Sequence, residues 1–200
     1  MVKRVFIVHY WGGNPRSCWY PWLKKELEAK GYKVIVPLMP DTENPKIDRW
    51  VAKLKSVVGK LDENTFFIGH SVGCQTILRY LESENKMGKT RNDKKINDAK
   101  KIGGILFVAP WLTLSPAVMD SKKESKIAKP WLSKKIDFSK TTSTTKNITA
   151  IFSRRDPYVP LENVKLFKEL LNAKTLIEKN KGHFDDDSET EKVPVILKYF

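Results

Sequence analysis

The sequence has few cysteines and no long apolar run. Its 200 residues include only two cysteines, Cys18 and Cys74, which form neither a spaced disulfide framework nor a zinc-ligand pattern. The apolar run Val5–Val8 near the start is too short for a signal peptide, and no stretch approaches the roughly 20 residues that a membrane-spanning helix needs. These absences argue against a disulfide-rich or membrane-embedded protein. We therefore expect a reducing, cytoplasmic location.

The chain carries an excess of positive charge, with a formal net charge of +14 at pH 7. Most of the excess is lysine interspersed with acids, which is typical of solvated helix surfaces. The densest basic stretch, residues 86–101, is interrupted by Asp93 and Asp98 and has no aromatic side chain on which a base could stack. We expect an exposed, mobile loop there, and neither a nucleic acid nor a membrane as partner.

Short apolar runs alternate with segments of helical periodicity along the chain. Runs rich in β-branched residues predict buried strands, and apolar residues three or four apart predict helices. This alternation predicts an α/β fold with a parallel sheet of about six strands and helices on both faces. Because 40% of the residues are hydrophobic, one core can form, and we predict a single domain over residues 1–200. The predicted strands are Val5–Val8, Val34–Val36, Thr65–Ile68, Ile105–Ala109, Ile148–Phe152 and Thr175–Ile177.

Three further segments carry specific expectations. Asn44 is placed to cap a helix with Pro45 at its first position, and a last helix is predicted over residues 193–200. The segment 110–147 is long and less periodic than the other connections, so we expect it to pack over the top of the sheet.

The stretch Phe66–Gly73 places a serine between two glycines directly after an apolar run. This Gly-x-Ser-x-Gly pattern is typical of a sharp turn from a strand into a helix, in which the serine hydroxyl is exposed and can act as a nucleophile. Gly69 and Gly73 would leave room where a Cβ would clash. An ordinary turn serine is the alternative, so Ser71 needs partners to be read as catalytic.

A serine hydroxyl is a poor nucleophile near neutral pH, so a catalytic Ser71 needs a base and a carboxylate that holds the base. The chain has three histidines. We expect His70 to point away from the serine and His9 to support the loop after the first strand. His183 follows the last predicted strand, at the carboxyl edge where open α/β sheets carry their chemistry, and is the candidate base.

Asp156 follows the fifth predicted strand at the same edge and is the candidate carboxylate. The chain order Ser71, Asp156, His183 is then the order expected of an α/β-hydrolase. Asp185 to Asp187 lie close to His183 in sequence and are interpreted as loop charges, although Asp185 stays an alternative partner for the base.

Together these motifs resemble the small serine hydrolases related to retinoblastoma-binding protein 9 and the bacterial YdeN-like proteins. The resemblance covers nearly the whole chain and implies a compact α/β-hydrolase fold with a minimal cap, lacking the usual first two strands. It also implies Ser71 as nucleophile, His183 as general base and then acid, and Asp156 as the group that orients the imidazole. The residues that carry it are His9–Gly13, Trp19–Leu23, Pro37–Asp41, Pro45, Trp50, Gly69–Gly73, Asp156–Pro160 and Gly182–Phe184.

The chain departs from that family pattern in two places. His9-Tyr10 stands where relatives often have His-Gly, so we assign the oxyanion donors to the backbone N–H groups of Trp11 and Val72, with Tyr10 as an alternative to Trp11. Arg155 stands where relatives often carry a second acid, and it would be able to compete for the carboxylate of Asp156.

We interpret the sequence as a serine hydrolase, specifically a carboxylesterase that acts on small acyl esters through an acyl-enzyme. It would need no metal and no organic cofactor, and its partner would be a small-molecule ester. Candidate walls of its pocket are Tyr10, Trp11, Trp111 and Trp131, each of which is otherwise a packing aromatic. The alternative function is a binding or regulatory protein on a hydrolase scaffold whose catalytic residues are idle or secondary.

Overall fold

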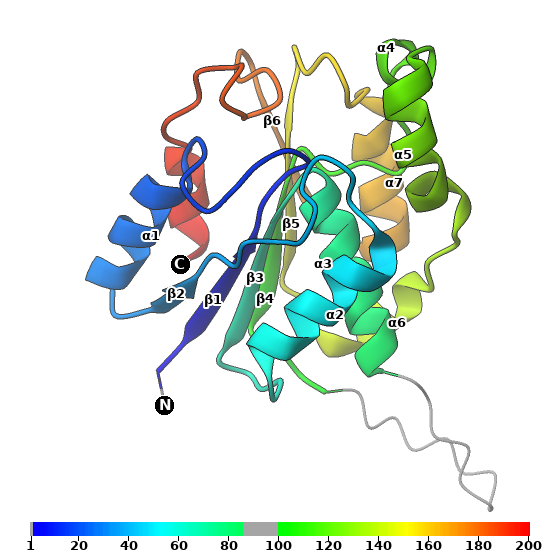
Figure 1. The fold of residues 1–200 in the computed structure, drawn as a ribbon. Helices are drawn as coiled ribbons and strands as arrows, with labels where there is room; N and C mark the ends of the chain where they lie inside the picture. Colours follow the sequence, from blue (N-terminus) through cyan, green and yellow to red (C-terminus); the bar gives the residue numbers. More distant parts are fainter. Residues whose placement is uncertain (1, 86–99) are drawn as a thin grey trace, which may run out of the picture.

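In the computed structural model, which describes residues 2–85 and 100–200, the strands form one six-stranded sheet in the order β2-β1-β3-β4-β5-β6 (Figure 1). All neighbouring strands are parallel. The predicted α/β fold with a parallel sheet is confirmed. The strands are β1 (Arg4–Val8), β2 (Lys33–Ile35), β3 (Thr65–His70), β4 (Gly104–Val108), β5 (Ile148–Ser153) and β6 (Lys174–Glu178).

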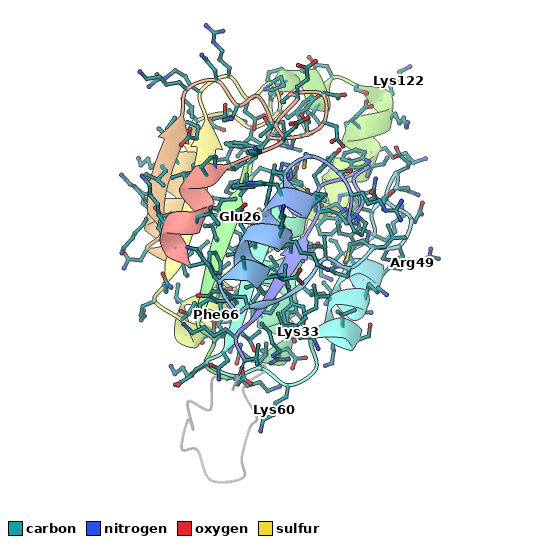
Figure 2. The ribbon with its side chains drawn as sticks, turned by 90° about the vertical axis from the view of Figure 1, so that its left-hand side faces the viewer. Glu26, Lys33, Arg49, Lys60, Phe66 and Lys122 are labelled. Atoms are coloured by element: carbon teal, nitrogen blue, oxygen red, sulfur yellow. The ribbon has the colours of Figure 1, made fainter. Side chains whose placement is uncertain are left out.

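Helices cover both faces of the sheet. The helix α1 (Tyr20–Ala29) and the C-terminal 3-10 helix η1 (Pro194–Tyr199) lie on one face, and Figure 2 looks onto this face, with Glu26 marking α1. The other face carries α2 (Ile47–Val58), α3 (Val72–Glu84), α6 (Phe138–Thr144) and α7 (Glu162–Leu171). The predicted two-sided cover is therefore present.

Alternation along each strand divides the core into two layers. In β1, Val5 and Ile7 belong to the cluster that includes Leu23 of α1, because successive side chains of a strand point to opposite faces. Phe6 and Val8 belong to the cluster that includes residues of α2, α3 and α7. The strands read as continuous apolar runs because both of their faces are buried.

The strand order reverses direction between β1 and β3. From β1 the chain moves outward to β2, then returns to the other side of β1 to form β3 and continues through β4, β5 and β6. In open parallel sheets such a reversal leaves a crevice at the carboxyl ends of the two central strands, where ligands bind. The loop that begins at His9 and the turn at Ser71 both start at this point.

The start of α2 differs from the expectation. The helix begins at Ile47 with Lys46 as its N-cap residue, in place of the predicted Asn44 cap. The backbone N–H of Asn44 closes a turn onto the carbonyl of Asp41, and the carbonyl of Pro45 accepts a hydrogen bond from Trp131 Nε1 at 3.1 Å. The first backbone bond of the helix runs from the N–H of Trp50 to the carbonyl of Lys46, so the carbonyl of Pro45 lies outside the helix and is bound by Trp131.

The segment 110–147 contributes α4 (Pro116–Met119), α5 (Lys122–Ser133) and α6. The first two lie beyond the carboxyl edge of the sheet, at the top of Figure 1, as expected for a segment that packs over it. The predicted last helix is the short 3-10 helix η1.

The lysine-rich stretch lies, apart from its last two residues, outside the described residues. Near its C-terminal end, Lys100 forms an ion pair with Glu84 at 2.7 Å. Lys55 of α2 pairs with the same carboxylate at 2.7 Å. No helix within the described ranges is long and apolar enough to cross a membrane.

Candidate active site

Ser71 occupies the sharp turn between β3 and α3. Its backbone has φ 54° and ψ −120°, a left-handed conformation that costs energy for any residue with a Cβ. A Cβ on Gly69 would lie 2.7 Å from the Cα of Cys74, and a Cβ on Gly73 would clash with the backbone carbonyl of Val8. The two glycines thus allow α3 to pack directly against β1 and β3, as the sequence predicts.

The side chains of His183 and Asp156 are joined by a hydrogen bond. Nδ1 of His183 lies 2.8 Å from Oδ2 of Asp156, and the Asp156 side chain is 1% exposed. Because a carboxylate only accepts, the hydrogen is on Nδ1, which leaves Nε2 of a neutral His183 with a lone pair. The other carboxylate oxygen, Oδ1, accepts from the backbone N–H groups of Tyr158 and Val159 at 2.9 and 3.0 Å. Asp156 is therefore fixed on both sides.

Ser71 and His183 line the same cavity, which has a volume of about 280 Å³. Ser71 comes from the end of β3, and His183 comes from the loop after β6. Over the described residues, the hydroxyl Oγ accepts a hydrogen bond from Trp111 Nε1 at 3.3 Å, and no hydrogen bond joins it to the imidazole. The fold thus brings the three predicted residues to the carboxyl edge of the sheet. Asp156 is hydrogen-bonded to His183, and His183 lines the same cavity as Ser71.

His70 points away from the cavity, as expected, and connects the loop after β6 with α1 and, through α1, with the loop after β1. Nε2 donates to the backbone carbonyl of His183 at 2.7 Å, because a carbonyl oxygen can only accept. Nδ1 then accepts from the hydroxyl of Tyr20 at 2.7 Å, and that hydroxyl accepts from the backbone N–H of Tyr10 at 3.2 Å. Complete burial lowers the pKa of His70 well below 6.5, so the ring is neutral.

His9 supports the loop after β1, as predicted. Its Nε2 accepts from the backbone N–H of Met39 at 3.1 Å, and its Nδ1 donates to the carbonyl of Tyr10 at 2.8 Å. Burial lowers the pKa of His9 below 6.5, which favours the neutral ring that this pattern requires.

The backbone N–H groups assigned as oxyanion donors, those of Trp11 and Val72, stand at the two loops that meet at the strand reversal. In the part of the chain that the structure describes, neither of them donates to a protein acceptor. The alternative donor Tyr10 does not fit this role, because its N–H is bonded to the Tyr20 hydroxyl. Trp11 is itself held by a 3.0 Å hydrogen bond from Nε1 to the carbonyl of Glu43.

Neither Asp185, the alternative partner of His183, nor Arg155, which would be able to bind Asp156, replaces the hydrogen bond between His183 and Asp156. Oδ1 of Asp185 accepts from the backbone N–H and the hydroxyl of Ser188, at 2.9 and 2.6 Å, and so closes the loop after β6. Arg155 is exposed, and among the described residues it forms no ion pair with Asp156. Arg155 therefore does not compete for the Asp156 carboxylate in this structure.

Two of the four predicted aromatic walls line the cavity, namely Trp11 and Trp111. Tyr10 instead donates its hydroxyl to Asp186 at 2.7 Å, and Trp131 lies in the core with its indole bonded to Pro45. The other lining residues were not predicted from the sequence, and they come from the loop before α2, the α4–α5 region and the loop after β5. They are Glu43, Leu114, Ala117, Val118, Lys123, Glu124 and Tyr158.

Tyr158 has a recognisable signal in the sequence, because it stands two residues after Asp156. Its ring packs edge-on against His183, with 5.1 Å between centroids. Burial, with the negative charges of Asp185 and Asp187, raises the pKa of the Tyr158 hydroxyl. The contribution of α4 and α5 has no such signal, because it depends on how the segment 110–147 folds back.

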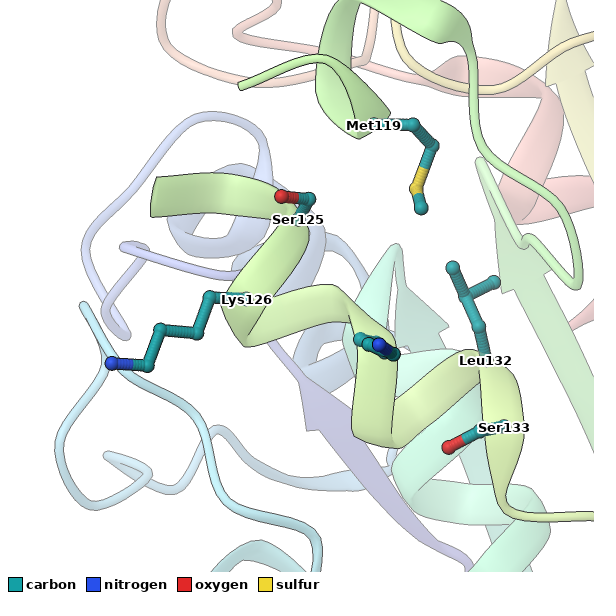
Figure 3. Close-up of a pocket in the computed structure, with 6 residues that line it drawn as sticks. Met119, Ser125, Lys126, Leu132 and Ser133 are labelled. Atoms are coloured by element: carbon teal, nitrogen blue, oxygen red, sulfur yellow. The ribbon is translucent and has the colours of Figure 1, made fainter. Parts of the chain in front are cut away.

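A larger hollow, about 610 Å³ in volume, lies between α4 and α5 (Figure 3). Met119 and Leu132 point toward one another across it, and its rim carries Ser125, Lys126 and Ser133. It includes none of the predicted site residues. Within the described ranges, no group of three or more His, Cys, Asp or Glu side chains is placed to hold a metal ion.

The sequence profile of the serine hydrolase family matches residues 5–200, which include Ser71, Asp156 and His183. The chain belongs to the serine hydrolase family. The family resemblance noted in the sequence is thereby confirmed, and hydrolase activity follows from it.

This serine hydrolase is similar to two relatives over nearly its whole length. It is 27% identical to YdeN of Bacillus subtilis over 196 residues, which cover 98% of this chain and 93% of YdeN. It is 24% identical to the serine hydrolase RBBP9 of Rattus norvegicus over 197 residues, covering 98% and 94% of the two chains.

Solved structures of two other proteins have a similar fold. The crystal structure of Bacillus subtilis YdeN superposes with a TM-score of 0.81, covering 100% of this chain and 99% of that one. Est1E of Butyrivibrio proteoclasticus, solved with ferulic acid bound, superposes with a TM-score of 0.67 at 14% identity, covering 98% of this chain and 88% of that one. The second likeness shows the shared α/β-hydrolase fold.

Proposed function

We propose that this serine hydrolase is a carboxylesterase that cleaves small acyl esters with Ser71 as nucleophile. The observation that supports it most directly is the pairing of His183 with the buried Asp156 at 2.8 Å, beside a cavity that Ser71 also lines. Asp156 fixes the tautomer in which Nε2 accepts a proton, and this is the arrangement that activates a serine hydroxyl.

The proposed reaction has two halves. In acylation, Oγ of Ser71 bonds to the carbonyl carbon of the ester while its proton passes to Nε2 of His183, and the carbonyl electrons move onto the oxygen. The N–H groups of Trp11 and Val72 stabilise that oxyanion. The intermediate then collapses, and the alcohol leaves with the proton from His183. In deacylation, water attacks the acyl carbon in the same way, and Ser71 regains its proton.

The cavity supports a small substrate. Its volume of about 280 Å³ lies just below the range of about 300–1,000 Å³ that is typical of ligand pockets. Trp11, Trp111 and Leu114 give it apolar walls, whereas Glu43, Lys123 and Glu124 supply charge. We infer a short acyl group and a small leaving alcohol.

A fluorophosphonate probe tests the proposal, because it reacts covalently with activated serines. We expect labelling of the native protein, loss of labelling in Ser71→Ala, and full labelling in the matched control Ser56→Ala, whose serine lies on α2. Hydrolysis of p-nitrophenyl acetate, followed by release of p-nitrophenol, should depend on Ser71 in the same way. If the native protein is neither labelled nor active on a panel of short esters, the catalytic proposal fails and a binding role on the hydrolase scaffold is favoured.

A further inference from the structure

The indole of Trp111 contacts the atom that would react. Its Nε1 donates to Oγ of Ser71 at 3.3 Å, and the Trp111 residue is 3% exposed. Other tryptophans of the chain satisfy their indole N–H on backbone carbonyls, at distances of 2.8 to 3.1 Å. Those tryptophans are Trp11, Trp19, Trp50 and Trp131. Trp111 differs because its acceptor is a side-chain hydroxyl.

Two buried side chains hold Trp111 in this position. From α3, Nε2 of Gln75 donates to the carbonyl of Trp111 at 3.2 Å, and Arg79 orients that amide by donating to its Oε1 at 3.1 Å. From α7, Oδ1 of Asn163 accepts from the N–H of Leu112, the next residue, at 2.7 Å. Gln75 and Asn163 are 1% and 0% exposed. The backbone that carries the indole is therefore held by α3, which begins directly after Ser71, and by α7, which follows the loop of Asp156.

The direction of the hydrogen bond is compatible with catalysis. A serine hydroxyl has one hydrogen and two lone pairs. When Trp111 donates to one lone pair, the hydroxyl hydrogen stays free to move to His183, and the second lone pair stays free to attack a carbonyl carbon. The contact therefore does not compete with the proposed proton transfer.

We propose that Trp111 is a catalytic residue whose indole N–H stabilises negative charge on Oγ of Ser71. This inference rests on the proposed function. Charge develops on Oγ when its proton passes to His183 during attack. It develops again in deacylation, when the bond between the acyl carbon and Oγ breaks and its electron pair returns to Oγ, which then takes the proton from His183. Hydrogen bonds to charged groups are stronger than neutral ones, so the indole binds both transition states better than the resting hydroxyl.

The test compares Trp111→Phe with Trp131→Phe. Both variants remove a buried indole N–H and keep an aromatic ring, but Trp131 donates to the carbonyl of Pro45 in the core. The measured quantities are the second-order rate of phosphonylation by a fluorophosphonate, and the single-turnover acylation and deacylation rates with p-nitrophenyl acetate. We expect all three to fall about tenfold in Trp111→Phe and to stay within about twofold of the native rates in Trp131→Phe.

A second variant distinguishes the effect of losing the N–H from the effect of changing the shape of the cavity wall. Replacement of Trp111 by 3-benzothienylalanine keeps the size of the indole but has sulfur in place of the N–H, so the rates should fall as in Trp111→Phe. This variant also decides the question if Trp111→Phe does not fold. Native rates or faster rates in the benzothienyl variant overturn the inference while the proposed function stands. Absence of any reaction in the native protein overturns the proposed function itself.

Discussion

The side chain of His70 donates a hydrogen bond of 2.7 Å to the backbone carbonyl of His183, which lies 113 residues further along the chain. The residue next to the proposed nucleophile thus holds the backbone of the proposed base. Through Tyr20 the same imidazole reaches the N–H of Tyr10, at the start of the loop that carries Trp11. One neutral ring therefore connects the parts of the site that come from β1, β3 and the loop after β6.

Replacement of His70 by leucine should lower both stability and kcat. It leaves the buried hydroxyl hydrogen of Tyr20 without an acceptor and the buried carbonyl of His183 without a donor, at a cost of about 1–3 kcal/mol for each. His70→Gln is the matched variant, because its Nε2 occupies nearly the position of the imidazole Nε2 and can still donate to His183. We expect a higher kcat in His70→Gln than in His70→Leu, measured on p-nitrophenyl acetate together with urea unfolding. Equal kcat values in the two variants would show that the contact with His183 is not needed for activity.

Asp156→Asn should abolish most of the activity while leaving the fold intact. The amide cannot hold His183 in the tautomer with the hydrogen on Nδ1, and comparable changes in serine hydrolysis cost about ten-thousandfold in kcat. Asp187→Asn is the control, because Asp187 is exposed on the loop after β6. A larger loss of kcat in Asp185→Asn than in Asp156→Asn would contradict the assignment and transfer the role to Asp185.

Stability should fall as the pH is lowered below 6.5. Burial lowers the pKa of His9 and His70 below 6.5 in the folded protein, whereas both rings take up a proton near 6.5 once unfolded. The unfolded state therefore binds more protons below that pH. Each histidine contributes a slope of up to about 1.4 kcal/mol per pH unit to the free energy of unfolding.

Urea unfolding of the native protein and of His70→Gln at several values between pH 6.5 and about pH 5.5 measures this slope, because most carboxylates titrate lower. The variant should lose about half of the slope, since His9 is left. An unchanged slope in His70→Gln would mean that His70 is protonated in the folded protein.

Gly73→Ala should destabilise the protein more than Gly31→Ala. A Cβ on Gly73 meets the backbone carbonyl of Val8, which cannot move without separating α3 from β1, and we expect a loss of about 3 kcal/mol or failure to fold. Gly31 has open space around it but a φ of 85°, so alanine there loses only about 1 kcal/mol of stability, because its Cβ disfavours a positive φ. Thermal unfolding gives the comparison, and the reverse order would argue against close packing at Gly73.

Local patterns were sufficient for the six strands and for the turn at Ser71. The strand β1 and the turn at Ser71 are predictable because buried parallel strands require continuous apolar residues and the tight turn requires Gly69 and Gly73. The start of α2 was not predicted correctly, and the residue before its N-cap, Pro45, is in contact with Trp131, which is 86 residues away in the sequence. Contacts at such separations leave no local pattern.

The sequence by itself determined the sheet, the family, and the edge at which Ser71, Asp156 and His183 gather. Parallel strands place all their carboxyl ends on one side, so a residue that follows a strand is already located to within a loop. Only the tertiary structure decided which side chains touch. It placed Asp156, and not Asp185, on His183. It also bonded His70, which was already expected to point away from the serine, to the backbone carbonyl of His183, and it directed the indole of Trp111 to the Ser71 hydroxyl. Hydrogen bonds act over about 3 Å, and such distances are fixed by the packing of whole helices and loops against one another.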